Sequence, residues 1–369
     1  MEEIKKITSV EQFIKEIQSL NKEDSHLYYR GQNHFDYNLL PGILRNKSFY
    51  EDEDQLFTDF LTECPDLFKN CENNYDRLAI MQHHQLPTRL LDITANPLIA
   101  LFFACDGKEK DDEEDEKKDG SVFVFTDKVE KEIVEKVFNS IKMPNAGKEI
   151  IAKQGRNYID FYKNPYSDEI ELESSLVRLD FEVKKQIFDQ IYKFLKFIST
   201  HPNNKTWNEV YNNWVKNNKR RYGMDKYFED KYKVLAGDGS IAFQSLFHEI
   251  KKDVFNYRVM LNPIDLLTPK LVKPRTIDSR IKNQKGAFIF VPFIVSEIGY
   301  DEVVNKDLEL VDMIRYCSDS GDTIKFRIPQ KQKKSILEEL ATLGINRSFI
   351  YPDDYSMVAG EIKDKFLKS

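Results

Sequence analysis

The sequence predicts an α+β fold, with a mixed or antiparallel sheet core built from both ends of the chain and a helical insertion between them. Short apolar runs typical of strands occur before residue 127 and after residue 263. Residues 128–262 instead contain Lys-rich amphipathic segments with few Gly or Pro residues. We therefore predict that residues 1–127 and 263–369 form the two parts of one core, and that residues 128–262 form a helical subdomain.

Local signals predict the first elements of the core. Residues 10–20 carry apolar side chains at helical spacing, and Ser9 precedes them as an N-cap. The run LYYRGQ, residues 27–32, is expected to be a strand that stops at its glycine. Residues 51–84 are expected to be helical.

A loop, a strand and a buried helix are predicted in residues 86–105. LPTRLLDIT reads as a loop followed by a strand. NPLIALFFAC reads as a helix, because Asn96 can cap it and Pro97 is tolerated at its first position. The charged run at residues 108–120 has no EF-hand pattern and is expected to be a solvated loop. A strand, SVFVFT, is expected after it.

Strand signals return in the last third of the chain, at PKLVKP, KGAFIFVPFIV and DTIKFRIP. The last predicted helix is KKSILEELATLG, which Gly344 ends. The predicted insertion between the two parts contains the amphipathic helices LDFEVKKQIFDQIYKFLKFI and FQSLFHEIKKDVF.

Composition excludes several classes of protein. The 62 acidic and 55 basic residues give a net charge of −7, which shows no bias towards nucleic acid. No apolar leader opens the chain, and no run is long enough to span a bilayer. The cysteines have no zinc-site spacing and are typical of reduced core residues. We expect a cytoplasmic protein with no metal site and no membrane partner.

The first candidate site residue is Arg30, in the run YYRGQ. Its guanidinium can hold a phosphate or a carboxylate through two hydrogen bonds. Gly31 beside it lets a ligand or another strand approach closely. The alternative is structural: Arg30 then ties down a loop carbonyl or a buried aspartate.

A second candidate group crowds into QHHQLPTRLLDIT. His83 and His84 are adjacent, so on a helix they point roughly 100° apart and only one can face a given site. Arg89 and Asp92 are expected to form a buried pair that fixes geometry. At the strand-to-helix junction, Asn96 can cap the helix, whose free amides can hold an anion.

A third candidate group stands in RIKNQKGAFIF, where Arg280 and Gln284 precede an apolar strand and Gly286 allows close approach. Ordinary turn chemistry explains the same residues equally well. The sequence contains no P-loop, GxGxxG, GxSxG or HExxH motif.

Together, five segments resemble the FRG domain family, which is named for an aromatic-Arg-Gly motif like Tyr29-Arg30-Gly31. The segments are YYRGQ, LLPGILR, QHHQLPTRLLDITANPLIALFFA, SRIKNQKGAFIF and LGINRSFIYPDDYSMVAGEI. One departure is Ile93, where many relatives carry Trp. The resemblance implies a bacterial or phage protein, and its association with defence genes implies an intracellular effector, a toxin or an antiviral defence protein.

The same segments are more distantly similar to ADP-ribosyltransferases, which implies an NAD site and NAD-dependent glycosyl transfer. Tyr29-Arg30-Gly31 then resembles the first element of that site, Thr94 the hydroxyl region and Gln284 the third element. The sequence departs from the pattern because no ExE pair is present and a Gln cannot act as a carboxylate base. The candidate catalytic residues are Arg30, His83, Asp92 and Gln284. The candidate cofactor-binding residues are Tyr29, Gly31, Gln32, Arg89, Thr94, Asn96, Arg280 and Gly286.

Two other functions stay open. One is a hydrolase or nuclease that uses His83 or His84 with Asp92. The other is a non-catalytic binding module that senses a phage ligand or a nucleotide ligand. Because each is a polar group at the edge of an apolar strand, we predict that residues 29–31, 92–96 and 280–286 converge on one cleft. We also predict that residues 128–262 do not supply most of the site.

Overall fold

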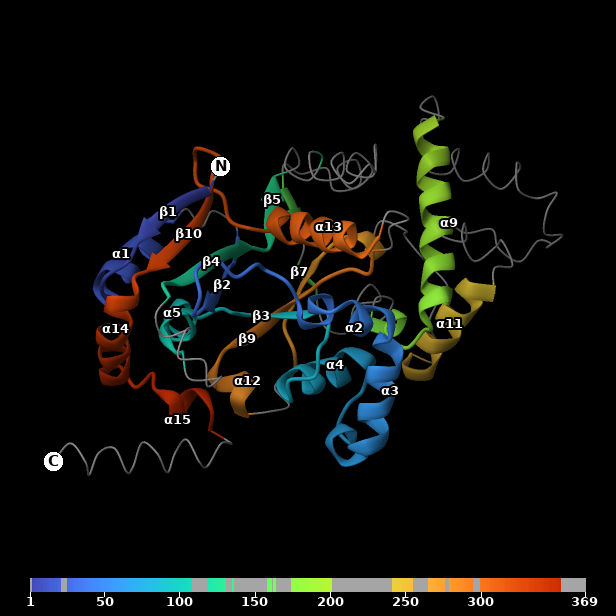
Figure 1. The fold of residues 1–369 in the computed structure, drawn as a ribbon, viewed down its shortest axis with the longest axis horizontal. Helices are drawn as coiled ribbons and strands as arrows, with labels where there is room; N and C mark the ends of the chain where they lie inside the picture. The colour runs from blue at the N-terminus through green and yellow to red at the C-terminus, as the bar shows by residue number, and fades with distance from the viewer. Residues whose placement is uncertain are drawn as a thin grey trace.

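The computed structural model of the chain describes residues 2–20, 25–107, 118–130, 135, 158–160, 162–163, 174–200, 241–254, 265–275, 279–294 and 299–352. Its centre is an eight-stranded mixed sheet with the order β1-β10-β4-β2-β3-β9-β8-β7 (Figure 1). β1–β10 and β7–β8 pair in parallel, and the other neighbours are antiparallel. The strands are β1 (Glu2–Lys6), β2 (Leu27–Gln32), β3 (Leu90–Thr94), β4 (Gly120–Thr126), β7 (Tyr162–Lys163), β8 (Lys270–Val272), β9 (Gly286–Phe290) and β10 (Thr323–Ile328). The predicted α+β class, with a sheet drawn from both ends of the chain, is confirmed.

Helices flank both faces of this sheet. Those described are α1 (Val10–Ser19), α2 (Lys47–Glu51), α3 (Glu53–Glu63), α4 (Asn74–His83), α5 (Pro97–Cys105), α9 (Phe181–Thr200), α11 (Ile241–Asp253), α12 (Ser279–Asn283), α13 (Tyr300–Met313), α14 (Gln330–Thr342) and α15 (Arg347–Ile350). Short 3-10 turns are η1 (Gly42–Arg45), η2 (Pro65–Phe68) and η5 (Asp265–Leu267). No helix among the described residues combines the length and apolar character needed to cross a bilayer.

The predicted helix ends follow from side-chain capping. Ser9 accepts a hydrogen bond from the backbone N–H of Gln12 at 3.2 Å, which starts α1. Asn96 Oδ1 accepts from the N–H of Leu98 at 3.0 Å, which starts α5. After α14, Gly344 adopts a φ of +80°, a conformation that glycine reaches without strain.

The middle of the chain contributes strands as well as helices. β5 (Lys128–Glu130) and β6 (Tyr158–Asp160) form a separate two-stranded sheet, and β7 adds an edge strand to the main sheet. The predicted helices α9 and α11 are present and lie side by side at the right of Figure 1. Much of residues 128–262 lies outside the described residues, so a subdomain with those boundaries stays a prediction.

The two faces of the sheet are covered differently. Phe123 and Phe125 of β4 pack in the same cluster as α9, α11 and α13. Val122 and Val124, which alternate with them, pack with α1, α5 and α14. Further along that second face, β9 packs Phe288 and Phe290 against α3 and α4. One face of the sheet is therefore covered by a single hydrophobic cluster, and the other face by two.

Two glycines allow α5 to lie directly against the sheet. A Cβ at Gly31 would stand 1.8 Å from the carbonyl oxygen of Ala100, and one at Gly120 would stand 2.0 Å from that of Ala104. We predicted that Gly31 admits a ligand or another strand, but the segment that lies against it is the helix α5.

The sheet opens between β2 and β3. β2 pairs with β4 at each residue from Leu27 to Gln32, and β3 pairs with β9 from Leu90 to Thr94. Between β2 and β3, however, the register contains only Tyr29 opposite Thr94. We call this opening the seam; it separates the two halves of the sheet at the centre of the strand order.

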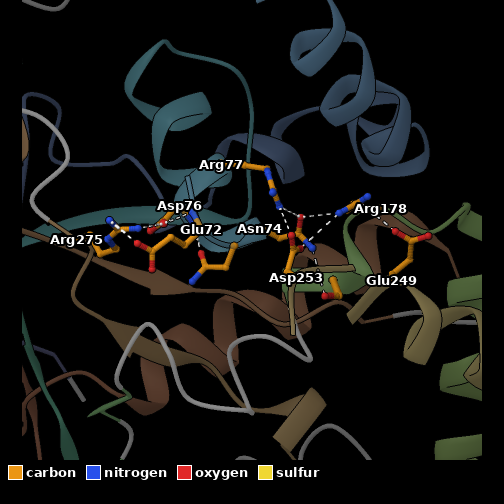
Figure 2. Close-up of polar contacts among 10 residues, drawn as sticks. Glu72, Asn74, Asp76, Arg77, Arg178, Glu249, Asp253 and Arg275 are labelled. Atoms are coloured by element: carbon orange, nitrogen blue, oxygen red, sulfur yellow. Dashed lines mark hydrogen bonds and ion pairs between the residues drawn. The ribbon is translucent and has the colours of Figure 1, made fainter. Parts of the chain in front are cut away.

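A network of ion pairs fixes the N-terminal end of α4 (Figure 2). Arg77 of α4 lies 2.9 Å from Asp253 of α11, and Arg178 lies 3.5 Å from the same carboxylate. On the other side, Arg275 lies 2.9 Å from Asp76, whose side chain is almost fully buried. The opposite end of α4 carries two of the site residues described below.

A buried charge cluster joins α3 and α9 to the residue directly before β3. Glu53 lies 2.7 Å from Arg89 and 2.8 Å from Lys184, and all three side chains are buried. The predicted pair of Arg89 with Asp92 is therefore wrong, because Arg89 turns into the core and pairs with Glu53. Asp307 of α13 lies in the same region; it is fully buried, and neither of its oxygens has a hydrogen-bond partner within the described part of the chain.

Candidate functional site

A cavity of about 820 Å³ opens at the seam and brings the three candidate segments together. The candidate residues that line it are Tyr29, Arg30, Gly31, Gln32, His83, Asp92, Thr94, Arg280, Gln284 and Gly286. Consecutive residues of β3, from Leu90 to Thr94, all contribute to its wall. Because neighbouring strand residues point to opposite faces, the cavity meets β3 along its edge rather than on one face.

Arg30 bridges the seam. Its Nη1 donates to the backbone carbonyl oxygen of Asp92 at 2.6 Å and lies 3.8 Å from Asp92 Oδ2. The guanidinium thus occupies the place of the ladder hydrogen bond that β2 and β3 do not make. Its Nε is buried without a hydrogen-bond partner in the described residues. Burial, followed by the positive charge of Arg45, lowers the pKa of Arg30 against the opposing effect of Asp92.

Asp92 is held in position but remains open to solvent. Its side chain is 58% exposed, and Oδ2 accepts a hydrogen bond from Gln82 Nε2 at 2.8 Å. Thr88 in turn donates to Gln82 Oε1 at 2.7 Å, which fixes the amide. This chain of contacts runs from the C-terminal end of α4 to β3 and orients one carboxylate at the cavity wall.

Thr94 joins the end of β3 to the start of β9. Its hydroxyl donates to the backbone carbonyl oxygen of Gln284 at 2.6 Å and accepts from the N–H of Asn96 at 2.9 Å. The hydroxyl therefore both donates and accepts a hydrogen bond within the fold. Asn96 does not line the cavity and caps α5, so its observed role is structural.

Gln284 projects into the cavity with one end fixed. Its side-chain Nε2 donates to the carbonyl oxygen of Ile350 at 3.1 Å, which leaves Oε1 as the end that can accept from a ligand. Gly286 follows it, but a Cβ there would meet no atom closer than 3.6 Å. The expected close approach at Gly286 is therefore absent within the described residues.

The remaining candidates differ in how they face the cavity. His83 lines it, whereas the exposed His84 lies outside its wall with its ring 6.3 Å from that of Phe60. Arg280 lies over the ring of Tyr351 at 4.5 Å, so the two side chains form part of the wall together. Arg89 does not reach the cavity.

Two further candidates of β2 are buried. Tyr29 is 3% exposed, and burial raises the pKa of its hydroxyl to about 12. Gln32 donates from Nε2 to the carbonyl oxygen of Asn38 at 3.3 Å, while its buried Oε1 has no partner among the described residues. Gln32 therefore supports the loop that follows β2.

Arg45 and Tyr37 line the wall but were not among the site residues predicted from the sequence. Arg45, at the end of η1, is exposed and makes no ion pair or hydrogen bond within the described part of the chain. Tyr37, in the loop after β2, is 46% exposed. Arg45 belongs to the segment LLPGILR, but its place at the cavity depends on a contact of η1 with the start of β3, where Ile43 N–H donates to the Thr88 carbonyl.

The cavity has a positive balance of charge. Its wall contains the cations Arg30, Arg45 and Arg280 and, among the described residues, the carboxylates Asp92 and Asp106. Asp106 is paired with Arg347, so Asp92 is the carboxylate that faces the open space. In the part of the chain that the structure describes, no three His, Cys, Asp or Glu side chains gather in a way that could hold a metal ion.

Comparison with known proteins identifies one part of the chain. Residues 25–113 match the model of the FRG domain family. No curated protein and no solved structure matches the sequence. The match includes β2, η1, α4, β3 and α5, while the predicted extension of the FRG core to residues 263–369 stays a prediction. Residues 25–113 are therefore similar to an FRG domain, and this segment supplies the β2 and β3 sides of the cavity.

Proposed function

We propose that the cavity at the seam binds a nucleotide with a phosphate or diphosphate group, and that NAD is this ligand. The observation that carries the proposal is that Arg30 and Arg45 both line the cavity. Arg45 is near enough to lower the pKa of Arg30, and it has no anionic partner in the described residues. Two guanidinium groups so placed favour a ligand with more than one negative charge.

The size and lining of the cavity fit a ligand of this class. Small-molecule sites usually measure about 300–1,000 Å³ and combine apolar walls with a few polar groups. The volume of about 820 Å³ lies inside that range, and Phe49, Phe103 and Tyr351 provide apolar and aromatic wall. A ligand that joins an anionic group to a flat apolar ring uses both kinds of surface.

Asp92 and Gln284 provide a chemistry for the ribose. When the bond between the ribose C1′ and the nicotinamide nitrogen breaks, the electron pair leaves with nicotinamide and positive charge develops on the sugar. Asp92, held by Gln82 and Arg30, is positioned to stabilise that charge. Gln284 Oε1 is positioned to accept a hydrogen bond from a ribose hydroxyl. A nucleophile, either water or a group on a target molecule, then attacks C1′ and forms the new bond.

This proposal makes the protein an NAD-consuming enzyme of ADP-ribosyltransferase type. An intracellular effector or anti-phage role extends the proposal and rests on the family resemblance. The hydrolase or nuclease alternative is weaker, because the Asp92 carboxylate is engaged by Gln82 and Arg30 instead of orienting a histidine base.

Calorimetric titration of the full chain tests the binding step. We expect NAD and ADP to bind, and Arg45→Ala to weaken both about tenfold or more. Lys47→Ala is the matched control, because Lys47 is an exposed cation two residues away that does not line the cavity. Equal affinity in the wild type and Arg45→Ala would contradict the anion site.

Release of nicotinamide from NAD tests the chemical step. We expect Asp92→Asn to lower the rate about a hundredfold while NAD binding changes little, because the carboxylate acts on charge that appears only in the transition state. Asp66→Asn, at an exposed aspartate of η2, is the control. Binding without any nicotinamide release would leave a ligand-sensing module as the function.

A further inference from the structure

Tyr37 presents an aromatic ring at the cavity from the loop that follows β2. Among the described residues it is one of the few large apolar side chains that stay substantially exposed, at 46%, and it belongs to the cavity wall. An exposed aromatic ring at a binding cavity is a ready contact surface, because a planar ligand ring gains burial and dispersion there.

The ring of His34 supports Tyr37 from one side. The two rings are nearly parallel, with centroids 4.5 Å apart and an interplanar angle of 14°. The His34 ring is itself fixed, because the backbone N–H of Asp36 donates to His34 Nδ1 at 3.1 Å. Tyr37 therefore enters the cavity as the outer member of a two-ring stack.

Buried cations hold the loop in this conformation. Lys333 Nζ donates to the carbonyl oxygen of Asn33 at 2.5 Å, and Lys325 Nζ donates to that of Phe35 at 2.9 Å. Both lysine side chains are less than one-tenth exposed. Desolvation of two ammonium groups is costly, and these contacts offset part of that cost. The loop is thus fixed at its start and its middle before any ligand binds.

We infer that Tyr37 is the stacking platform for the adenine ring of the nucleotide, with Arg30 and Arg45 at the phosphate end of the same cavity. This inference rests on the proposed function and adds the residue that recognises the ring. A rigid platform loses little conformational freedom on binding, so its contribution to affinity is retained. Stacking of this kind changes affinity about tenfold or more when the aromatic residue is removed.

Titration of the full chain with ADP and with inorganic pyrophosphate separates the two ends of the site. We expect Tyr37→Leu to weaken ADP about tenfold or more and to leave pyrophosphate within about twofold. Tyr37→Phe keeps the ring and is expected to bind ADP like the wild type. Phe349→Leu is the control, because Phe349 is also an exposed aromatic residue, at 38%, and does not line the cavity.

The outcomes separate the inference from the function on which it rests. Pyrophosphate binding with unchanged ADP affinity in Tyr37→Leu would overturn the platform and leave the anion site standing. An equal loss of ADP affinity in Tyr37→Phe and Tyr37→Leu would also overturn the platform, because the hydroxyl rather than the ring would then determine binding. Failure of the wild type to bind either probe would overturn both proposals. A melting temperature within about 2 °C of the wild type shows that each variant is folded.

Discussion

Arg30 combines two roles that the sequence presents as alternatives. The side chain ties β2 to β3 through the carbonyl oxygen of Asp92, and it also lines the cavity. We expect Arg30→Ala to weaken ADP binding about tenfold or more and to lower the melting temperature by a few degrees, at about 1–2 kcal/mol for the lost hydrogen bond. Arg30→Lys is expected to recover stability better than binding, because an ammonium group can reach a carbonyl but cannot offer a planar fork. Calorimetry and thermal melting on the same samples distinguish these effects, and wild-type affinity in Arg30→Ala would contradict a role in the site.

Gly31 and Gly286 both line the cavity, but only Gly31 has no space beside it for a side chain. A methyl group at Gly31 would collide with the backbone of α5, whereas one at Gly286 would make ordinary contacts. We expect Gly31→Ala to lower the free energy of unfolding by about 1–3 kcal/mol or more, and Gly286→Ala to change it by about 0.5 kcal/mol or less. Urea unfolding measures both. Similar values for the two variants would show that α5 does not lie as tightly on β2 as described.

The limits of prediction at single residues have a physical cause. Arg30 could be identified because its neighbours in sequence, an aromatic residue and a glycine, define its surroundings. The partner of Arg89 was predicted wrongly because Glu53 lies on α3, far from Arg89 in sequence, and residue type alone does not choose between Glu53 and the nearer Asp92. Tyr37 and Arg45 carry no local signal, since their place in the site depends on how a loop and a short turn fold against distant strands.

At the scale of elements, the buried charge cluster under β3 should make stability depend on pH. Burial raises the pKa of Asp307 on α13 well above its ordinary 3.8. The folded protein therefore keeps a proton that the unfolded chain releases, so stability falls as the pH rises above about 4 and until the folded carboxyl ionises. Each pH unit over that interval costs about 1.4 kcal/mol.

Asp307→Asn removes this dependence, because an amide fills a similar volume and carries no titrating proton. We expect the variant to have a higher free energy of unfolding than the wild type at pH 7, by about 1 kcal/mol or more, and little advantage near pH 4. Asp301→Asn, at an exposed position of the same helix, serves as the comparison. Urea unfolding as a function of pH gives the answer, and an advantage of Asp307→Asn that grows towards low pH would contradict the assignment.

Glu53 should respond in the opposite sense. Its burial raises the pKa, but Arg89 and Lys184 outweigh this and hold the pKa of Glu53 below its ordinary value of 4.5. The ionised carboxylate therefore stabilises the fold above that value, and the contribution is lost as the pH falls through the lowered pKa. We expect Glu53→Gln to cost about 3–5 kcal/mol at neutral pH, since it leaves two buried cations without a counter-charge. Thermal melting at pH 7 measures the loss, and a variant as stable as the wild type would contradict the buried pairing.

Elements with strong local signals were predictable, and those that depend on a partner were not. α1, α5 and α14 combine apolar spacing with a capping residue, and all three are confirmed. β1 is mostly charged and exists because β10 supplies its hydrogen bonds. The predicted strand in KGAFIFVPFIV ends at Phe290, two residues before Pro292, because proline has no backbone N–H to donate.

At the scale of the whole molecule, α9 and α11 share one core with the sheet. Phe188 of α9 is fully buried, and its ring centroid lies 5.3 Å from that of Phe293, which follows β9. We expect a single calorimetric transition, and we expect Phe188→Ala to move all of it to lower temperature, at a cost of about 3–5 kcal/mol. Two transitions, of which only one moves, would instead indicate that the helices unfold as a separate unit.

The seam makes the centre of the sheet its least tightly connected part. Strands next to each other usually protect their amides from exchange with solvent deuterium, but β2 and β3 share a single register pair. A molecule that spans the seam would contact both halves of the sheet and link them. Deuterium uptake along β2 and β3 should then slow when the cavity is filled, whatever the chemical identity of the occupant, so exchange could report a natural ligand in a cell extract before that ligand is known.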